Sequence, residues 1–533
     1  MRFREQACAI ALGLGLLAAC GAPELSDESR TLHRGNESEP LTLDPQKSVL
    51  NREFEISNDL FVGLYTPGPD GLPTRGLAES ETISEDGRVW RFTLREMRWS
   101  DGAPVTAEDM AAGLRRLMDP ATRSEFAMFL TVIENASEVQ RGAAPPEALG
   151  VTALDQRTLE IRLDYPAPFL PSLLTPPATP LPRHALEVHG EDWVRPGVMV
   201  SNGPYLLADW RSNNFVRLER NPYFESDETL CFDEVFYYPT TDRQAALRRV
   251  RAGELDLDTG VPVQSVVMLR ERFPELLNQS PGTFSNELIV NVNSPPFDDV
   301  RVRRALSMAI DRRFITQELF NGAHPPSWRI LPPNLPGAAP DLSADFADLP
   351  MAQRLEDASA LLVEAGFGPD NPLRFRFHTV PGFAIVAPVL QQDWALIAPW
   401  VTAEIVQQDA QLHYAQLKAG DYQIGYGGWT AAYPDPHAVL LQWETVSRDM
   451  NYSRWTDPAF DAAMNAAKSS PDPDVRMARF AEAERLVVDA VAHIPLYIRD
   501  SYDLVRPDIT GWVTNPFSRN PSRWLCRASD AAE

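Results

Sequence analysis

The sequence predicts an α/β fold in which strands and helices form packed layers. Segments with an apolar residue at every second position, typical of half-buried strands, alternate with segments whose apolar residues recur every three to four positions, typical of helices. The 533 residues are 44% hydrophobic and 23% charged, an ordinary globular composition. The 47 prolines favour short strands and turns over a helical bundle. Length alone predicts two to four domains or one large α/β body.

The first twenty residues predict export and attachment to lipid. Arg2 and Arg4 precede an apolar stretch over residues 7–19. This stretch is shorter than the ~20 residues of a membrane span but has the length of a signal-peptide core. It ends in Leu-Ala-Ala-Cys-Gly, which resembles a bacterial lipobox, so Cys20 is predicted to be lipidated after removal of residues 1–19. A signal peptide cut elsewhere, with Cys20 incidental, is the alternative.

The elements that follow have local signals of their own. Residues 20–34 are small and polar and are predicted to be the lipidated N-terminus and a linker. Thr106 can cap a helix with Asp109 three residues on, and Gly253 can end another. Strands are predicted at 89–94, 159–163 and 422–426, a proline-dense boundary at 166–182, and helices at about 106–119, 243–251, 299–320, 357–365, 458–467 and 474–492.

The charge and the cysteines limit the partners and the chemistry. The excess of 74 acidic over 49 basic residues argues against a nucleic acid partner, because binding to a nucleic acid backbone needs clustered Lys and Arg. After export, Cys231 and Cys526 remain in an oxidising compartment. A disulfide between them is favoured, and two buried free thiols are the alternative. Two cysteines so far apart make a poor zinc site.

No motif for catalysis, a metal or a cofactor stands out. Walker, Gly-x-Ser-x-Gly and His-Glu-x-x-His motifs are absent from the sequence. His184 and Glu187 share a helix face, but His189 is turned away by about 140°. Asp256 and Asp258 could serve as an acid–base pair, but their spacing in the sequence does not imply that two carboxylates lie at a catalytic distance. We therefore predict no enzyme activity, no metal and no cofactor.

A glycine-rich aromatic segment is the best candidate for binding. It begins after the predicted strand 422–426 and reads GGWTAAYPDP over residues 427–436. The paired glycines allow close backbone approach, and Trp429 and Tyr433 offer flat apolar faces with a polar edge. Such a loop suits the wall of a ligand site, whereas a buried aromatic turn is the alternative.

Several short motifs follow one another across the chain. They are FVGLY at 61–65, GLAE at 76–79, WRFTLR at 90–95 running into RWSDGAPVTAED at 98–109, SNGPY at 201–205, RNPYF at 220–224, RAGELD at 251–256, FDDVRVRRALSMAID at 297–311, GW at 428–429 and IPLY at 494–497. Together they are similar to the extracellular solute-binding proteins of family 5, the oligopeptide and dipeptide receptors of ABC importers.

The resemblance implies a periplasmic-binding-protein-like fold of two α/β lobes with the ligand cleft between them. Lobe I would hold residues 35–275 and 500–533, with an extra subdomain at about 56–174, and lobe II would hold 276–499. Cys231 and Cys526 would both fall in lobe I, which supports their pairing. Closure of the lobes around the ligand would present the receptor to its permease.

The departures from the family pattern put a peptide ligand in question. Peptide-binding members carry an aspartate for the ligand ammonium where this chain has Ala432, and some carry an arginine where it has Tyr426. Asp435 is a possible substitute, and capping the proline turn is its alternative role. The candidate cleft residues are Phe126, Asn202, Asp258, Thr259, Gly260, Tyr426, Gly428, Trp429, Thr430, Ala431, Ala432, Tyr433 and Asp435.

The function predicted from the sequence is therefore that of a substrate-binding lipoprotein of an ABC importer. It would be a monomer in the periplasm that touches the membrane only through its lipid anchor. It would capture a peptide or peptide-like solute and deliver it to a permease and ATPase complex. The alternative is a receptor of the same fold for a non-peptide ligand, such as a sugar conjugate, an opine-like compound or a signalling compound, without a necessary role in transport.

Overall fold

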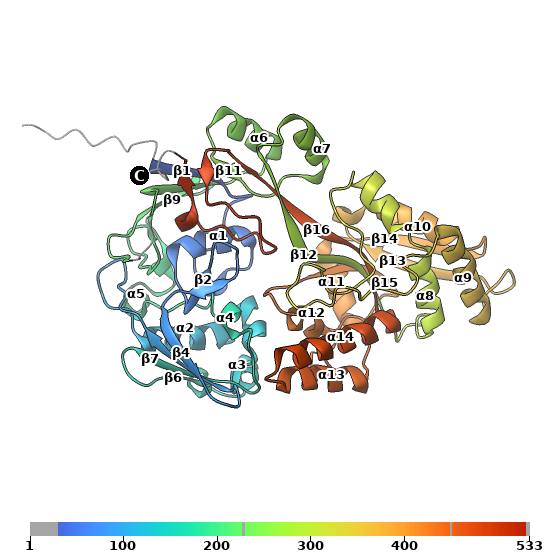
Figure 1. The fold of residues 1–533 in the computed structure, drawn as a ribbon, viewed down its shortest axis with the longest axis horizontal. Coiled ribbons are helices and arrows are strands. Elements are labelled where there is room, and N and C mark those ends of the chain that lie inside the picture. The colour runs from blue at the N-terminus through green and yellow to red at the C-terminus, as the bar shows by residue number, and fades with distance from the viewer. Residues whose placement is uncertain (1–29, 226–229, 448–449, 529–533) are drawn as a thin grey trace, which may run out of the picture.

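A mixed sheet of ten strands forms the centre of the computed structural model, which describes residues 30–225, 230–447 and 450–528 (Figure 1). The signal peptide and Cys20 lie outside the described residues. In sheet order the strands are β14 (Val401–Gln407), β13 (Leu373–Thr379), β15 (Ile424–Thr430), β12 (Leu277–Val290), β16 (His493–Val505), β11 (Leu257–Asp258), β1 (Thr31–Gly35), β10 (Glu234–Tyr238), β9 (Phe215–Arg220) and β8 (Tyr205–Arg211).

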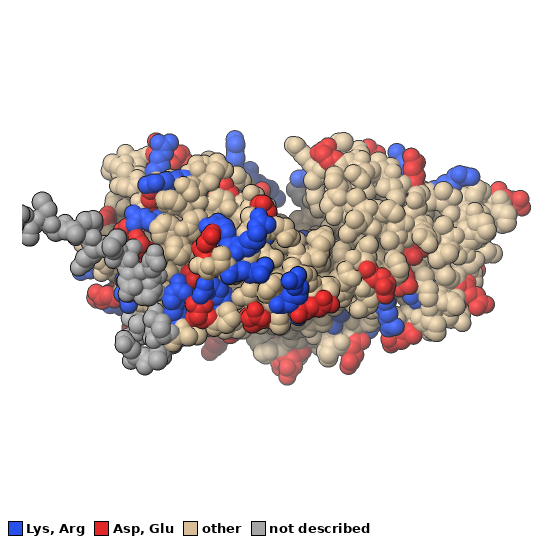
Figure 2. All heavy atoms as spheres, turned by 90° about the horizontal axis from the view of Figure 1, so that it is seen from above, with Lys and Arg blue, Asp and Glu red and all other residues tan. Residues whose placement is uncertain are grey.

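Two long antiparallel strands, β12 and β16, run between two lobes (Figure 1). Lobe I holds β1 and β8–β11, whereas lobe II holds β13–β15. The space-filling view shows the two lobes with a notch at their junction, and Lys and Arg side chains gather on one face of lobe I (Figure 2). The two-lobed α/β prediction is thus confirmed, while the residue boundaries of the lobes stay a prediction.

A second sheet builds out lobe I below the main sheet (Figure 1). Its strands are β4 (Ala78–Ile83), β5 (Val89–Leu94), β7 (Thr158–Arg162) and β6 (Val151–Ala153), in that order. The alternation predicted for β5 is real, because Trp90, Phe92 and Leu94 are buried while Arg91 and Thr93 are exposed. Two small pairs complete the strands, β2 (Tyr65–Pro67) with β3 (Pro73–Arg75) and β17 (Ile509–Thr510) with β18 (Cys526–Arg527).

The helices cover the sheets and begin and end at recognisable caps. In α2 the Thr106 hydroxyl accepts from the Asp109 amide while the Asp109 carboxylate accepts from the Thr106 amide, the predicted capping box. Gly253 ends α6 at φ 78°, where a side chain would be strained. The helices are α1 (Asn51–Leu60), α2 (Ala107–Met118), α3 (Ala136–Gln140), α4 (Leu170–Leu173), α5 (Arg183–His189), α6 (Arg243–Ala252), α7 (Val263–Arg272), α8 (Val300–Ala309), α9 (Met351–Glu364), α10 (Ala387–Ala395), α11 (Ala410–Ala419), α12 (His437–Leu440), α13 (Pro458–Ser469) and α14 (Pro473–Ala490).

Three local predictions are wrong. Thr31–Arg34, assigned to the linker, lie in β1, which is buried because it pairs in parallel with β10 on one side and β11 on the other. The helix predicted at 299–320 ends as α8 at Ala309, since Ile310 is extended and Asp311 starts a separate π-helical turn at Phe314–Leu319. Strand β15 runs on to Thr430, so the predicted loop begins at Ala431 rather than Gly427.

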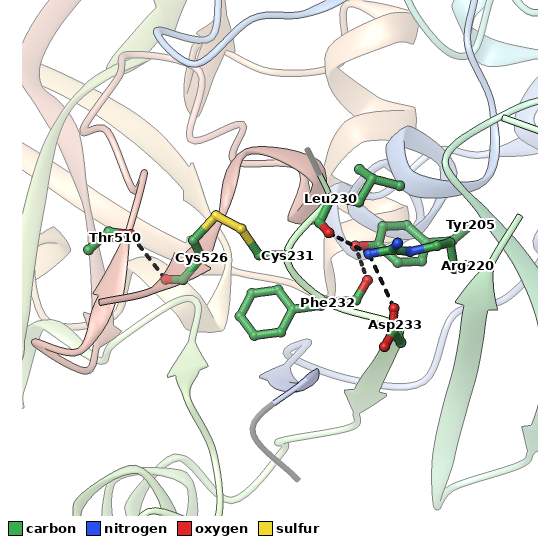
Figure 3. Close-up of a disulfide and its surroundings, with 8 residues drawn as sticks. All are labelled: Tyr205, Arg220, Leu230, Cys231, Phe232, Asp233, Thr510 and Cys526. Atoms are coloured by element: carbon green, nitrogen blue, oxygen red, sulfur yellow. Dashed lines mark hydrogen bonds and ion pairs between the residues drawn. A yellow bond between two sulfur atoms is a disulfide. The ribbon is translucent and has the colours of Figure 1, made fainter. Parts of the chain in front are cut away.

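A disulfide joins Cys231, just before β10, to Cys526 in β18 (Figure 3). It ties the C-terminal segment to the middle of the chain across 295 residues. Arg220 lies beside it and donates to the carbonyl of Leu230 and pairs with Asp233, so β9 is fastened to the same corner. No helix among the described residues is long and apolar enough to cross a membrane.

Replacing both Cys231 and Cys526 by serine is expected to lower the free energy of unfolding by about 2–4 kcal/mol, because the bridge restricts the unfolded chain across a long loop. Thermal unfolding measured with and without a reducing agent checks this. The reductant should lower the melting temperature of the parent protein and leave that of the double serine variant unchanged. An identical melting temperature for both proteins would contradict the prediction.

Candidate functional site

A cavity of about 400 Å³ lies between the lobes, and we call it the aromatic chamber. Its walls come from the start of lobe I, the segment after α2, the crossing strands, the end of β15 and the C-terminal segment. The lining residues are Ser48, Val49, Asn51, Phe54, Glu55, Glu125, Phe126, Met128, Phe129, Pro176, Pro177, Gly282, Thr283, Phe284, Thr430, Ala431, Ala432, Arg499, Ser501, Pro516, Phe517, Ser518 and Arg519. Five phenylalanines make this chamber suitable for apolar groups.

A second cavity of about 400 Å³, which we call the acidic chamber, adjoins the first. It is lined by Glu37, Asn51, Arg52, Glu55, Thr259, Gly260, Val261, Arg499, Asp500, Ser501, Tyr502, Asp503 and Ser518. Asn51, Glu55, Arg499, Ser501 and Ser518 line both chambers. The two chambers are therefore parts of one cleft, apolar at one end and rich in carboxylates at the other.

Strand β16 contributes residues 499–503 to the cleft, and Arg499 and Ser501 among them line both chambers. Arg499, Ser501 and Asp503 share one face of the strand because side chains alternate along it. Tyr502 points the other way, and its hydroxyl donates to the carbonyl of Ala323. This crossing strand thus lays a cation, a hydroxyl and a carboxylate in a row along the cleft.

Two arginines of the aromatic chamber have no carboxylate partner among the described residues. The Arg499 guanidinium lies 4.4 Å from the ring centre of Phe284, and that of Arg519 lies 5.9 Å from the ring centre of Phe517. Burial lowers the pKa of Arg519, and the charge of Glu55 opposes this shift. Both guanidiniums can therefore receive a carboxylate from a ligand.

The acidic chamber raises the pKa of the carboxyl groups around it. Burial raises the pKa of Asp503 to about 7, helped by the charges of Glu55, Asp258 and Glu37 and opposed by the amide of Gly260. Burial also raises the pKa of Asp258 to about 6, although the Thr240 hydroxyl and Arg243 oppose the shift. In the described part of the chain, no group of His, Cys, Asp and Glu is arranged to hold a metal ion.

Six of the residues predicted from the sequence line the cleft. Phe126, Thr430, Ala431 and Ala432 line the aromatic chamber, and Thr259 and Gly260 line the acidic one. Gly428 lies one step behind the wall, where a Cβ atom would come within 2.5 Å of the ring of Phe284. Glycine at 428 therefore lets this phenylalanine lie against β15 and face the chamber.

Three other candidates make structural contacts and line neither chamber. The Asn202 side chain is fully buried and bonds both to the amide of Val62, at 3.1 Å, and to its carbonyl, at 2.8 Å. Tyr426 stacks on Phe383 with ring centres 4.1 Å apart. Asp258 accepts a bond of 2.7 Å from the Thr240 hydroxyl behind the acidic chamber.

The side chains of Trp429, Tyr433 and Asp435 are also turned away from the chambers, although Thr430–Ala432 of the same segment line the aromatic chamber. The Trp429 indole donates to the carbonyl of Ala438 at 2.7 Å, and Tyr433 is buried against Phe169 with ring centres 5.1 Å apart. Asp435 forms a buried ion pair with Arg476 and accepts from the His437 amide. The side chains of Trp429 and Tyr433 are therefore placed as in the alternative interpretation, a buried aromatic turn. The carboxylate of Asp435 is already paired with Arg476.

Sequence reasoning missed Arg499, Asp503 and Arg519. Residues 501–504 do alternate in polarity, which is typical of a strand, but Arg499, Asp500 and Ser501 interrupt the pattern. The signal for a site was weaker, because a charged residue on a half-buried strand usually faces solvent. Only the pairing of β16 with β12 and β11 turns this face toward the cleft.

Two α/β lobes joined by crossing strands around a cleft define a solute-binding protein of the periplasmic type. The chain belongs to the bacterial extracellular solute-binding proteins, family 5, whose middle-region model matches residues 73–451.

Relatives and solved structures match this chain over nearly its whole length. In Escherichia coli, the probable deoxycholate-binding periplasmic protein YgiS is 33% identical and the periplasmic oligopeptide-binding protein OppA is 33% identical. The matches cover 90% of this chain and of YgiS, and 92% of this chain and of OppA. The open, unliganded structure of the murein tripeptide-binding protein MppA superposes with a TM-score of 0.81 at 30% identity, over 94% of this chain and 98% of that one. The structure of Haemophilus influenzae OppA in complex with the peptide RPPGFSPFR superposes with a TM-score of 0.79 at 28% identity, over 94% of this chain and 99% of that one.

Proposed function

We propose that the protein is a lipid-anchored periplasmic receptor that captures a peptide or peptide-like solute between its lobes and delivers it to an ABC permease and ATPase complex. The observation that carries this proposal is the two-chambered cleft, whose walls come from both lobes and from the strands between them. A state in which both lobes touch the ligand is selected by that ligand, because only that state makes contacts on both sides.

The chemistry of the cleft suits such a solute. Apolar side chains would pack among Phe54, Phe126, Phe129, Phe284 and Phe517, while a terminal carboxylate would be held by Arg499 and Arg519. Charge-assisted bonds from arginine to a carboxylate are among the strongest polar contacts in proteins. Two relatives, one named as oligopeptide-binding and one as murein peptide-binding, support a peptide ligand.

A non-peptide ligand is the second candidate, and the residues around Ala432 favour it. An alanine there leaves this wall without an acid for an ammonium group, while two unpaired arginines face the same apolar chamber. These features suit an amphipathic carboxylate. The relative YgiS, named as probably deoxycholate-binding, supports the same class.

Titration calorimetry with the tripeptide Ala-Phe-Phe and with deoxycholate separates the two candidates. Binding of the peptide alone supports the first proposal, and binding of deoxycholate alone supports the second. Replacing both Arg499 and Arg519 by alanine should weaken binding of the accepted carboxylate roughly 10- to 100-fold. The control Arg374→Ala, on an exposed position of β13, should leave affinity unchanged. Unchanged affinity in the double variant would remove the arginines from the site.

The anchor is tested separately. The intact mass of the mature protein should correspond to a chain that starts at Cys20 and carries acyl groups. A mass without acyl groups, or one that starts elsewhere, would contradict the anchor and leave the binding proposal in place.

A further inference from the structure

An unpaired carboxylate lies in the acidic chamber, which Ala432 does not line. Asp503 is 2% exposed and lines the acidic chamber. Its Oδ1 atom accepts from the Gly260 amide at 3.2 Å, and its Oδ2 atom has no hydrogen-bond partner in the described part of the chain. A buried carboxylate oxygen without a partner is costly, so its retention here calls for a partner that arrives from outside.

The charged groups facing Asp503 do not supply that partner. Glu55 is neutralised by Arg34 at 2.7 Å, and Arg243 lies 3.9 Å from both Glu37 and Asp258. Arg52 donates to the carbonyl of Glu39, while Asp500 accepts from Gln279 and from the Gly282 amide. Arg519 lines only the aromatic chamber, and Arg499, which borders both chambers, has its guanidinium 4.4 Å from the ring centre of Phe284. The acids around Asp503 therefore outnumber the cations available to it, and a cation in this chamber would be attracted.

An organic ammonium group suits Asp503 as a partner better than a metal ion does. The described carboxylates are not grouped in a way that could ligate a metal. An ammonium group has three N–H donors and no acceptors, so it can bond to Asp503 Oδ2 and to neighbouring oxygens at the same time. Ser501 and Arg499 border both chambers and offer a continuous path from this point to the aromatic chamber.

We propose that Asp503 is the counter-charge for the ammonium group of the bound solute, which enters the acidic chamber while the apolar part of the solute fills the aromatic chamber. This assignment rests on the proposed function of a peptide receptor. It moves the ammonium site from the wall at Ala432 to the crossing strand β16, and the solute then lies along the row Asp503, Ser501, Arg499.

Calorimetry with Ala-Phe-Phe and with its N-acetylated form tests the assignment. The parent protein should bind the free amine at least about tenfold more tightly than the acetylated peptide, since acetylation removes the charge and two donors. Asp503→Asn should abolish this preference. The matched control Asp393→Asn changes another buried carboxyl that lies outside both chambers, and it should keep the preference.

Proton release gives a second readout that needs no variant. The pKa of Asp503 in the empty protein is about 7, and a bound ammonium lowers it by favouring the charged form. Binding of the free amine should therefore tighten about tenfold from pH 5.5 to pH 7.5 and release a proton at pH 6.5. Calorimetry in two buffers of different ionisation enthalpy measures this release. The acetylated peptide should release none.

The outcomes separate this assignment from the function on which it rests. If neither peptide binds, the proposed peptide receptor is contradicted together with the assignment. If both peptides bind the parent protein equally and without proton release, the assignment is overturned while the receptor function stands. A free-amine preference that survives in Asp503→Asn also overturns it.

Discussion

Replacing Asp435 by alanine is expected to lower the free energy of unfolding by about 3–5 kcal/mol. Two hydrogen bonds of 2.7 and 2.9 Å join its carboxylate to the guanidinium of Arg476. The side chains of the pair are only 8% and 4% exposed. Removal of the carboxylate would leave a buried cation without a counter-charge, which is the most costly way to break such a pair. It would also remove the cap on the His437 amide.

Urea unfolding followed by tryptophan fluorescence checks this value. On the same helix α14, the pair Arg479–Glu482 is about half exposed on both sides, so Glu482→Ala should cost less than 1 kcal/mol. Replacing both members of the buried pair, as in Asp435→Asn with Arg476→Met, should cost less than Asp435→Ala alone because no charge is left unpaired. A loss below 1 kcal/mol for Asp435→Ala, accompanied by weaker ligand binding, would instead favour Asp435 as the ligand's partner.

This ion pair matters for the cleft because of where its arginine lies. The Arg476 guanidinium is 5.6 Å from the ring centre of Phe169 and 4.6 Å from that of Phe480. Phe169 in turn stacks on Tyr433, three residues after Thr430. The pair therefore fixes the segment that follows β15 and presents Thr430–Ala432 to the aromatic chamber. The buried side chains of Tyr433 and Asp435 thus position the wall that Thr430–Ala432 form.

The parts of the fold that could be predicted are those with local causes. The capping box at Thr106, the glycine that ends α6 and the alternation in β5 each depend on residues a few positions apart. Strand β1 was not predicted because its sequence is polar. Arg34 is buried there only because Glu55 pairs with it and because strands on both sides cover it. Non-local pairing reversed a local preference.

The site, like the fold, was predicted only where a local signal in the sequence marked a residue. Ala432 was found because it departs from a motif, and Thr259 and Gly260 because of their place beside one. Asp503 carries no such mark in a chain with 74 acidic residues. Its carboxylate accepts from the amide of Gly260, a residue 243 positions away in sequence. No periodicity or spacing contains that information.

Asp503→Asn is expected to stabilise the empty protein most at pH 8, less at pH 5, and little below pH 4. The folded-state pKa of Asp503 is about 7, above the ~3.9 of an exposed aspartate. For an acid with a raised pKa, the protonated form is favoured by folding, so stability is greatest below pH 4 and is lost as the pH rises through 7. Three pKa units correspond to roughly 4 kcal/mol, which sets the upper size of the gain at pH 8.

Thermal unfolding of the parent and the variant between pH 4 and pH 8 measures the difference. The melting temperature of the variant should exceed that of the parent by a few degrees at pH 8, and the difference should shrink steadily toward pH 4. Exposed Asp370→Asn serves as the control and should track the parent at every pH. Equal stability of parent and Asp503→Asn at pH 8 would show that the carboxylate is solvated in the empty cleft. A residue that weakens the fold when ionised, yet binds an ammonium only in that form, would exchange stability for ligand recognition at one position.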